Sequence, residues 1–174
     1  MQIRRAERDD LSAITEIYNE EVLTSTATFD TEPKQISEQI EWLSRHTDRH
    51  PVVVAVEDSQ VVGWASLSPW SDRCAYADCA EISIYIKQGF RRRGIGKHLA
   101  CHLIERARVC GLHTVIARVS ETSIGSIELC KRLGFSSIGT MKEVGRKFGK
   151  LLDVHLLQLV FSEKNSDGCA TGGK

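Results

Sequence analysis

Residues 81–97 read Glu-Ile-Ser-Ile-Tyr-Ile-Lys-Gln-Gly-Phe-Arg-Arg-Arg-Gly-Ile-Gly-Lys. Isoleucines alternate with other residues from Glu81 to Lys87, which is the two-residue period of a half-buried strand. Beyond the glycines, leucine, isoleucine and alanine recur at helical spacing as far as Gly111, which is placed to end a helix. The stretch therefore predicts a strand, a glycine-bearing turn and a long helix, a unit typical of α/β folds.

The turn within this stretch is strongly cationic. Five Lys or Arg side chains and no acid lie between Lys87 and Lys97, and Gly94 and Gly96 stand at the start of the helix. The N–H groups of a helix N-terminus point outward, the helix dipole favours anions there, and glycine allows close approach to the backbone. The turn therefore predicts a pyrophosphate site, with a solvated basic turn as the alternative.

Two nucleotide-binding motifs fail at this turn. The dinucleotide fingerprint needs a third glycine where Leu99 stands. The P-loop needs Lys after its second glycine, whereas Ile95 follows Gly94. The residues therefore exclude both motifs and leave the phosphate ligand open at this point.

Strands and helices alternate along the rest of the chain. A pair of acids, Asp9 and Asp10, is placed to cap the first helix, and Asp58-Ser59 is placed to form a hairpin turn. We predict one domain over residues 1–162 and a flexible tail over 163–174. Further strands are predicted at 2–6, 52–57, 61–68, 114–119, 135–141 and 152–161, and helices at 11–22, 36–46 and 123–133.

Composition excludes several classes of protein. The 174 residues carry 23 Lys plus Arg against 23 Asp plus Glu, so the net charge is zero and a broadly basic nucleic-acid surface is not expected. With 41% hydrophobic residues the chain is not of the disordered type. The longest β-like apolar run, Val52 to Val56, is too short to span a bilayer, and the N-terminus lacks the apolar segment of a signal peptide.

The six cysteines show no Cys-x-x-Cys spacing, so reduced thiols in a cytoplasmic protein are expected. His98 and His102 share a helix face, but no Glu follows His98 as the zinc-protease motif requires. We therefore expect no metal, no nucleic-acid partner and no membrane association.

Several motifs together resemble one family. Arg91 to Gly96 resembles the Gln/Arg-x-x-Gly-x-Gly/Ala acyl-CoA motif of the GNAT superfamily of N-acetyltransferases. The segments 17–22, 26–33, 80–86 and 144–149 are similar to its phosphinothricin (L-amino acid) N-acetyltransferase branch, and the resemblance covers residues 1 to about 161. It implies an α/β (α+β) GNAT fold: a central mixed, mostly antiparallel twisted sheet of about seven strands, flanked by about four helices.

The resemblance also implies an activity. The expected reaction is acetyl transfer from acetyl-CoA, the co-substrate, to the α-amino group of a small amino acid or analogue of the phosphinothricin, methionine sulfoximine or methionine sulfone type. A homodimer is expected. The alternatives are an acetyltransferase of a protein N-terminus, lysine or polyamine, and a non-catalytic acyl-CoA-binding module.

Site residues follow from the same resemblance. Glu81 matches the catalytic general base, and Cys130 stands where the branch often has His, a candidate proton donor to the leaving thiolate. Substrate contacts are expected from Ser71, Asp72, Arg73, Ile82 and Ser83. Acetyl-CoA contacts are expected from Ile84, Tyr85, Ile86, Arg92, Arg93, Gly94, Ile95, Gly96, Lys97, Ser123 and Arg132.

Three positions depart from the branch. Ser123 replaces a common Asn, Cys130 replaces His, and Leu151 replaces a Trp found in many relatives. Because a thiol is a weak donor, the thiolate is protonated by Cys130 or by water, or it leaves unassisted.

The chemistry of N-acetylation gives these residues their roles. An amine that arrives as ammonium must lose a proton to a base such as Glu81, and the oxyanion needs a fixed donor, for which an unpaired backbone N–H near Ile86 would serve. Without the resemblance, the residues leave open whether Glu81 is a base or an ordinary strand acid. For Cys130 a core position, and for Arg73 a solvated loop position, would then be the commoner interpretation. The basic segment from Val144 to Lys150 is either a solvated face or part of the dimer and substrate border.

Overall fold

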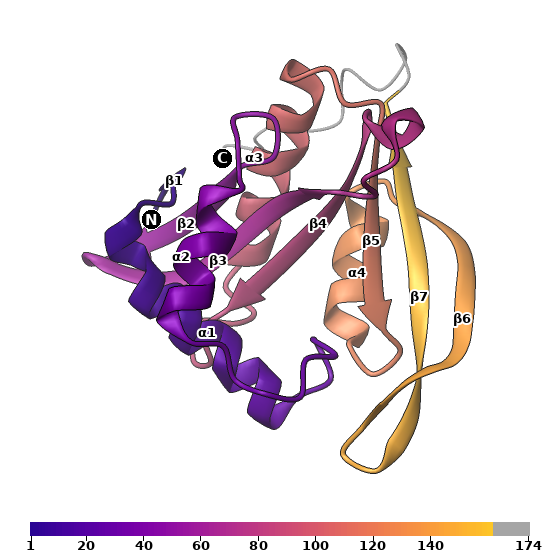
Figure 1. Ribbon diagram of the computed structural model, residues 1–174, viewed down its shortest axis with the longest axis horizontal. Coiled ribbons are helices and arrows are strands. Elements are labelled where there is room, and N and C mark those ends of the chain that lie inside the picture. Colours follow the sequence, from indigo (N-terminus) through magenta and orange to yellow (C-terminus); the bar gives the residue numbers. More distant parts are fainter. Residues whose placement is uncertain (162–174) are drawn as a thin grey trace.

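The computed structural model describes residues 1–161 and shows one seven-stranded sheet (Figure 1). The strand order is β1-β2-β3-β4-β5-β7-β6, and every neighbouring pair is antiparallel except β4 and β5. The expected mixed, mostly antiparallel sheet is confirmed. The strands are β1 Gln2–Arg5, β2 Val52–Glu57, β3 Gln60–Pro69, β4 Cys79–Ile86, β5 Thr114–Ser120, β6 Ser136–Lys147 and β7 Lys150–Val160.

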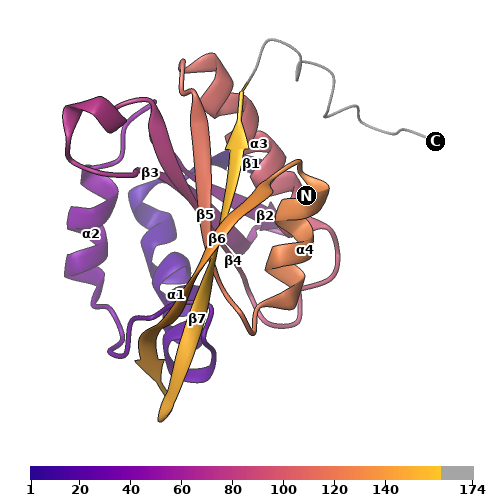
Figure 2. The same cartoon turned by 90° about the vertical axis from the view of Figure 1, so that its right-hand side faces the viewer.

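In the described part of the chain, four α-helices cover the two faces of the sheet. Helices α1 (Leu11–Thr24) and α2 (Ile36–Ser44) lie on one face, and α3 (Ile95–Val109) and α4 (Ile124–Arg132) lie on the other (Figure 2). Within residues 1–161 no helix is both long enough and apolar enough to cross a membrane.

Each face of the sheet has its own apolar core. On one face, Leu99 and Leu103 of α3 pack with the alternate residues Val115, Ala117 and Val119 of β5. The other core lies under α1 and α2 and consists of Ala6, Ile14, Ile17, Val52, Val54, Val61 and Trp64. The two-residue period of the strands thus sends successive side chains to different helical layers.

Strands β4 and β5 separate after a short parallel contact. Only residues 79–81 of β4 pair with residues 114–116 of β5. Beyond Glu81, β4 continues along β3 while β5 continues along β7, so the two strands diverge (Figure 1). The sheet therefore carries two strand edges that face each other without pairing.

Backbone hydrogen bonds show which groups of β4 face this opening. Lys87 N–H donates to Val62 O at 2.9 Å, and Trp70 N–H donates to Cys79 O at 3.1 Å. Since partners alternate in an antiparallel ladder, the odd-numbered residues of β4 bond to β3. The backbone groups of Ile84 and Ile86 point to the opposite, open edge, whereas those of Tyr85 are used by β3.

The β6–β7 hairpin corrects the sequence prediction of a short strand ending at Met141. Strand β6 runs on to Lys147 through a register shift between Met141 and Gly145. The hairpin turn contains Phe148 and Gly149, both with positive φ, as a tight two-residue turn requires. The basic segment from Val144 to Lys150 thus belongs to a long hairpin, which extends beyond β5 in Figure 2.

One further prediction differs from the structure. Asp10 precedes α1, but its carboxylate accepts two bonds from Arg4 at 2.7 Å and one from Glu7 N–H at 2.8 Å instead of capping the helix. The predicted tail over 163–174 lies outside the described residues. Asp58 and Ser59 do form the expected hairpin turn, both with positive φ.

Replacing Leu99 by Ala is expected to lower the free energy of unfolding by about 2–5 kcal/mol, because Leu99 is fully buried between α3 and the sheet. Urea denaturation measures the change. Val109→Ala, at a position of the same helix that is 67% exposed, is the matched control and should change stability little. Equal effects at the two positions would contradict the described packing of α3.

Candidate active site

The turn before α3 has the backbone shape of an anion-binding loop. Gly89, Arg92 and Gly94 all adopt positive φ, and Gly94 directly precedes the first residue of α3. Ile95 is buried, so its side chain anchors the turn while its backbone stays at the helix N-terminus. The glycine-bearing turn before a long helix, predicted from the sequence, is confirmed.

Charges on the turn are partly compensated, which the sequence did not predict. Acids distant in the chain pair with three of its five cations: Lys87 with Glu16 at 3.3 Å, Arg91 with Glu21, and Arg93 with Glu57 at 2.9 Å. Arg92 and Lys97 are exposed and form no ion pair within residues 1–161. These two side chains therefore supply the free positive charge, and Arg93 is held against β2.

The helix N-terminus lies beside the open edge of β4. A methyl group at Gly96 would lie 3.4 Å from Leu129 Cδ2 on α4 and 3.9 Å from Ile86 Cγ1 on β4. Arg91 Nε also donates to Ile86 O at 3.2 Å. The turn, α4 and the opening between β4 and β5 thus form one continuous region.

The two expected acetyl-CoA contacts on α4 lie at its opposite ends. Ser123 precedes the helix and donates its N–H to Ser120 O at 2.9 Å, while Arg132 is exposed at the last turn. Cys130 is buried in the core under α3 and α4. Burial raises the pKa of its thiol to about 11.

Glu81 lies at the point where β4 and β5 separate, and it is bound by a residue that the sequence reading missed. Arg118 of β5 donates from Nε and Nη2 to the two Glu81 carboxylate oxygens, at 2.7 and 2.6 Å. This pair raises the pKa of Arg118. The signal in the sequence was a lone cation inside the otherwise uncharged strand 114–120.

The predicted substrate residues lie around Glu81 with different orientations. Ser71, Asp72 and Arg73 lie on the partly exposed β3–β4 loop, where Arg73 N–H donates to Ser71 Oγ at 3.3 Å. Ser83 lies on the face of β4 that carries Glu81, but the Ile82 side chain is in the core beneath α3. The expected contact from Ile82 is therefore restricted to its backbone.

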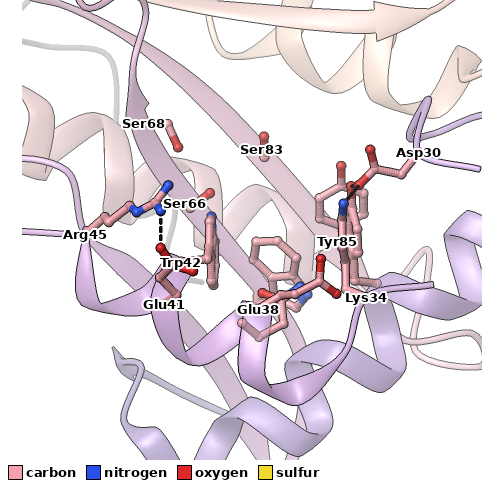
Figure 3. A pocket seen from close by; sticks show the side chains of 13 residues that line it. Asp30, Lys34, Glu38, Glu41, Trp42, Arg45, Ser66, Ser68, Ser83 and Tyr85 are labelled. Carbon is pink, nitrogen blue, oxygen red and sulfur yellow. Dashed lines mark hydrogen bonds and ion pairs between the residues drawn. The ribbon is translucent and has the colours of Figure 1, made fainter. Parts of the chain in front are cut away.

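A cleft of about 390 Å³ opens on the α2 side of the sheet (Figure 3). Its floor includes Ser66, Ser68 and Ser83, and Ser68 lies directly opposite Glu81 in the β3–β4 register. The lining residues are Tyr18, Asp30, Lys34, Glu38, Gln39, Glu41, Trp42, Arg45, Trp64, Ser66, Ser68, Ser83 and Tyr85. The cleft therefore reaches Ser68, the strand neighbour of Glu81, on the face of the sheet that carries the Glu81 side chain.

Charges and rings in the cleft are largely paired among themselves. Lys34 pairs with Asp30 at 3.1 Å, and Arg45 pairs with Glu41, as Figure 3 shows. The Trp64 ring lies 4.8 Å from the Tyr85 ring, and the buried Trp64 indole nitrogen has no hydrogen-bond partner within residues 1–161. The cleft thus combines an aromatic part with a row of hydroxyl groups.

A buried lysine connects the hairpin to the α1–α2 loop. Lys147 Nζ donates to Thr28 O at 2.7 Å and to Glu21 O at 3.5 Å, and burial lowers its pKa. Because the Glu21 carboxylate also binds Arg91, the hairpin, α1 and the cationic turn meet at Glu21.

The cysteines and the side chains that can bind metals can also be placed. Among the described residues, Cys74, Cys79, Cys101, Cys110 and Cys130 form no disulfide. Residues 1–161 contain no group of three or more His, Cys, Asp or Glu side chains that could hold a metal ion.

Comparison with known proteins identifies the family. The model of the acetyltransferase (GNAT) family matches residues 14–135. The chain belongs to the GNAT acetyltransferase family. This confirms the family that the motifs around the cationic turn resemble.

Individual GNAT proteins resemble the chain over most of its length. An L-methionine sulfoximine/L-methionine sulfone acetyltransferase of Salmonella typhimurium is 34% identical over 171 residues, covering 97% of this chain and 100% of that protein. A phosphinothricin acetyltransferase structure from Sinorhizobium meliloti, in complex with acetyl-CoA, has a TM-score of 0.90 at 35% identity and covers 98% and 94% of the two chains. A ribosomal-protein-alanine N-acetyltransferase structure from Brucella melitensis has a TM-score of 0.90 at 36% identity, covering 92% and 100%.

Replacing both Arg92 and Lys97 by Gln is expected to raise the Kd of this GNAT protein for acetyl-CoA by about 10- to 100-fold, since charge-assisted bonds to phosphate are lost. Calorimetry at low and high salt measures the change, and the salt dependence should be weaker in the variant. Arg108→Gln, near the other end of α3, should bind as the unchanged protein does. An unchanged Kd in the double variant would show that the phosphates bind elsewhere.

Replacing Cys130 by Ala is expected to leave kcat within about threefold between pH 6 and 9. Burial raises the pKa of the Cys130 thiol to about 11, whereas an ordinary thiol has a pKa of about 8.5. Proton transfer from Cys130 to a leaving thiolate is therefore unfavourable by roughly 3 kcal/mol. Cys79→Ala, which removes the other buried thiol of residues 1–161, controls for lost packing. A large, pH-dependent fall in kcat in the Cys130 variant alone would establish it as the donor.

Proposed function

We propose that this protein is an acetyl-CoA-dependent N-acetyltransferase of the α-amino group of small amino acids or analogues, of the phosphinothricin, methionine sulfoximine or methionine sulfone type. The observation that carries the proposal is the position of Glu81. Glu81 lies where the opening between β4 and β5 begins, and its neighbour on β3 is the cleft residue Ser68, so one base can serve two ligands. The names of the similar Salmonella and Sinorhizobium proteins support the acceptor class.

The chain offers a matching set of groups to acetyl-CoA. The open-edge backbone groups of Ile84 and Ile86 suit the amides of a pantetheine arm, since an unpaired strand edge binds extended amide chains. The turn at Gly94–Gly96, with Arg92 and Lys97, suits the pyrophosphate. When bound, acetyl-CoA supplies the activated acetyl group, and Ser123 and Arg132 are proposed as further contacts at the two ends of α4.

Glu81 is proposed to accept the proton that the acceptor ammonium must lose, directly or through a water molecule. The N–H of Ile86 or Ile84 is proposed to stabilise the negative charge that develops on the carbonyl oxygen. Because Cys130 is a weak acid, we propose water as the source of the proton for the leaving thiolate.

The cleft is proposed to receive the side chain of the acceptor. Ser66, Ser68 and Ser83 present hydroxyl groups that can bond the oxygens of a sulfone, sulfoximine or phosphinate. Trp42 and Trp64 present apolar surface that suits the methylene groups leading to them.

We also propose a homodimer in the cytoplasm. The β6–β7 hairpin exposes several apolar side chains, among them Ile138, Val144, Phe148 and Leu151, and single-chain proteins rarely expose a large apolar patch. Cys74, Cys79, Cys110 and Cys130 form no disulfide within residues 1–161, which fits a reducing compartment. Light scattering of the purified protein should give about twice the chain mass of 19.4 kDa.

A release assay for CoA tests the acceptor class. The panel contains L-methionine sulfoximine, L-methionine sulfone, phosphinothricin, a polyamine, and a peptide with an N-terminal alanine. Turnover on the free amino acids supports the proposal. Turnover on the peptide or polyamine alone would instead indicate an acetyltransferase of a protein N-terminus, lysine or polyamine. The name of the Brucella structure, a ribosomal-protein-alanine N-acetyltransferase, supports this alternative. Binding of acetyl-CoA without turnover on any amine would indicate a non-catalytic module.

Replacing Glu81 by Gln is expected to lower kcat by about 10²- to 10⁴-fold while the Kd for acetyl-CoA stays within about threefold, because the amide cannot accept a proton. Stopped-flow turnover and calorimetry give the two values. Glu128→Gln, on the exposed side of α4, is the control. Near-normal turnover of the Glu81 variant would remove Glu81 from the mechanism.

A further inference from the structure

Arg118 lies within reach of any amino acid that uses Glu81 as its base. In the parallel pair, Glu81 lies opposite Ile116, so Arg118, two residues further along β5, lies on the same face of the sheet. Its guanidinium crosses the opening between the diverging strands to the two Glu81 oxygens. A cation and an anion are therefore held side by side where the acceptor must bind.

The two members of this pair differ in exposure. The Glu81 side chain is 17% exposed, whereas the Arg118 side chain is 52% exposed, and its guanidinium lies over the Trp70 ring at 5.7 Å. Trp70 directly precedes the Ser71–Arg73 loop. Arg118 thus has N–H groups exposed and able to bind a ligand, while the Glu81 side chain is largely buried.

An α-amino acid carries the complementary charges. Its ammonium and carboxylate are separated by a single carbon, so an anion and a cation in direct contact can each take one of them. A guanidinium binds a carboxylate in bidentate geometry, as Arg118 already does with Glu81. When the acceptor binds, the Arg118–Glu81 pair would be replaced by two ion pairs. Arg118 would bind the acceptor carboxylate, and Glu81 would bind the acceptor ammonium.

Other nearby cations are less suited to this role. Lys34 and Arg45 line the cleft but are paired with Asp30 and Glu41 on the α2 side. Arg73 lies on the exposed loop, where its side chain forms no ion pair within residues 1–161. Arg118 is the cation in direct contact with the proposed base.

We propose that Arg118 binds the α-carboxylate of the acceptor and that the Arg118–Glu81 pair is the element that selects free α-amino acids over amines lacking a carboxylate. This inference rests on the proposed function, since it needs an amino-acid acceptor. In the free protein, Arg118 holds Glu81 in place. In the acceptor complex, Arg118 turns its N–H groups to the carboxylate, which leaves Glu81 beside the ammonium.

The test compares an acid with its amide in two proteins. The substrates are L-methionine sulfone and its α-carboxamide, and the proteins are the unchanged chain and Arg118→Gln. In Arg118→Gln the ratio of kcat/KM for the acid to kcat/KM for the carboxamide should fall about 30- to 100-fold, because only the acid loses a charge-assisted contact. Release of Glu81 from Arg118 affects both substrates alike. Intrinsic differences between the two amines cancel, because the ratio of acid to amide is compared between proteins.

Three further variants define the outcome. Arg118→Lys should recover part of the acid preference. Arg4→Gln breaks another bidentate Arg–carboxylate pair, with Asp10 at the far edge of the sheet, and should leave the preference unchanged. Arg73→Gln tests the competing cation, and loss of preference in that variant alone would overturn the proposal.

Two results separate the inference from the proposed function. If Arg118→Gln lowers kcat equally for acid and amide, Arg118 only positions Glu81 and the inference is wrong while the activity stands. If the unchanged protein acetylates the peptide or polyamine but neither sulfone substrate, the proposed acceptor class itself fails.

Discussion

The separation of β4 from β5 after Glu81 is the constraint on which the site depends. Both strands remain paired on their outer sides, with β3 and β7, so the opening lies inside the sheet and not at its edge. Unpaired backbone groups within a fold need partners, and the extended amides of a ligand can provide them. The proposed acetyl-CoA path, the proposed base Glu81 and the cleft beside β3 thus lie within a few residues of one strand.

Ion pairs from distant segments hold the walls of this opening. Glu21 of α1 binds Arg91, and Arg91 also bonds to Ile86 O, so α1 fixes the end of the open edge of β4. Lys147 of the hairpin bonds to the Glu21 backbone and to Thr28. The cationic turn, α1 and the β6–β7 hairpin are therefore connected through one buried residue, Glu21, and a buried charge is stable only while it keeps its partners.

Much of the fold could be read from the sequence, whereas the pairing of charges could not. The alternation in residues 81–87 and the glycines before α3 are local signals, and both gave the correct elements. The Glu81–Arg118 contact joins residues 37 positions apart, and Arg91–Glu21 joins residues 70 apart, so no local pattern contains them. Periodicity does place Ile82 and Ser83 on opposite faces, but only the register showed that Tyr85 bonds to β3 through its backbone.

Amide hydrogen exchange, resolved by residue with NMR, tests the strand separation most directly. In the free protein the amide of Tyr85 should be protected by β3, while those of Ile84 and Ile86 exchange quickly. On addition of acetyl-CoA, the Ile84 and Ile86 amides should become protected together with those of the turn before α3. Protection of Ile84 and Ile86 before acetyl-CoA is added, or its absence in the complex, would contradict the account.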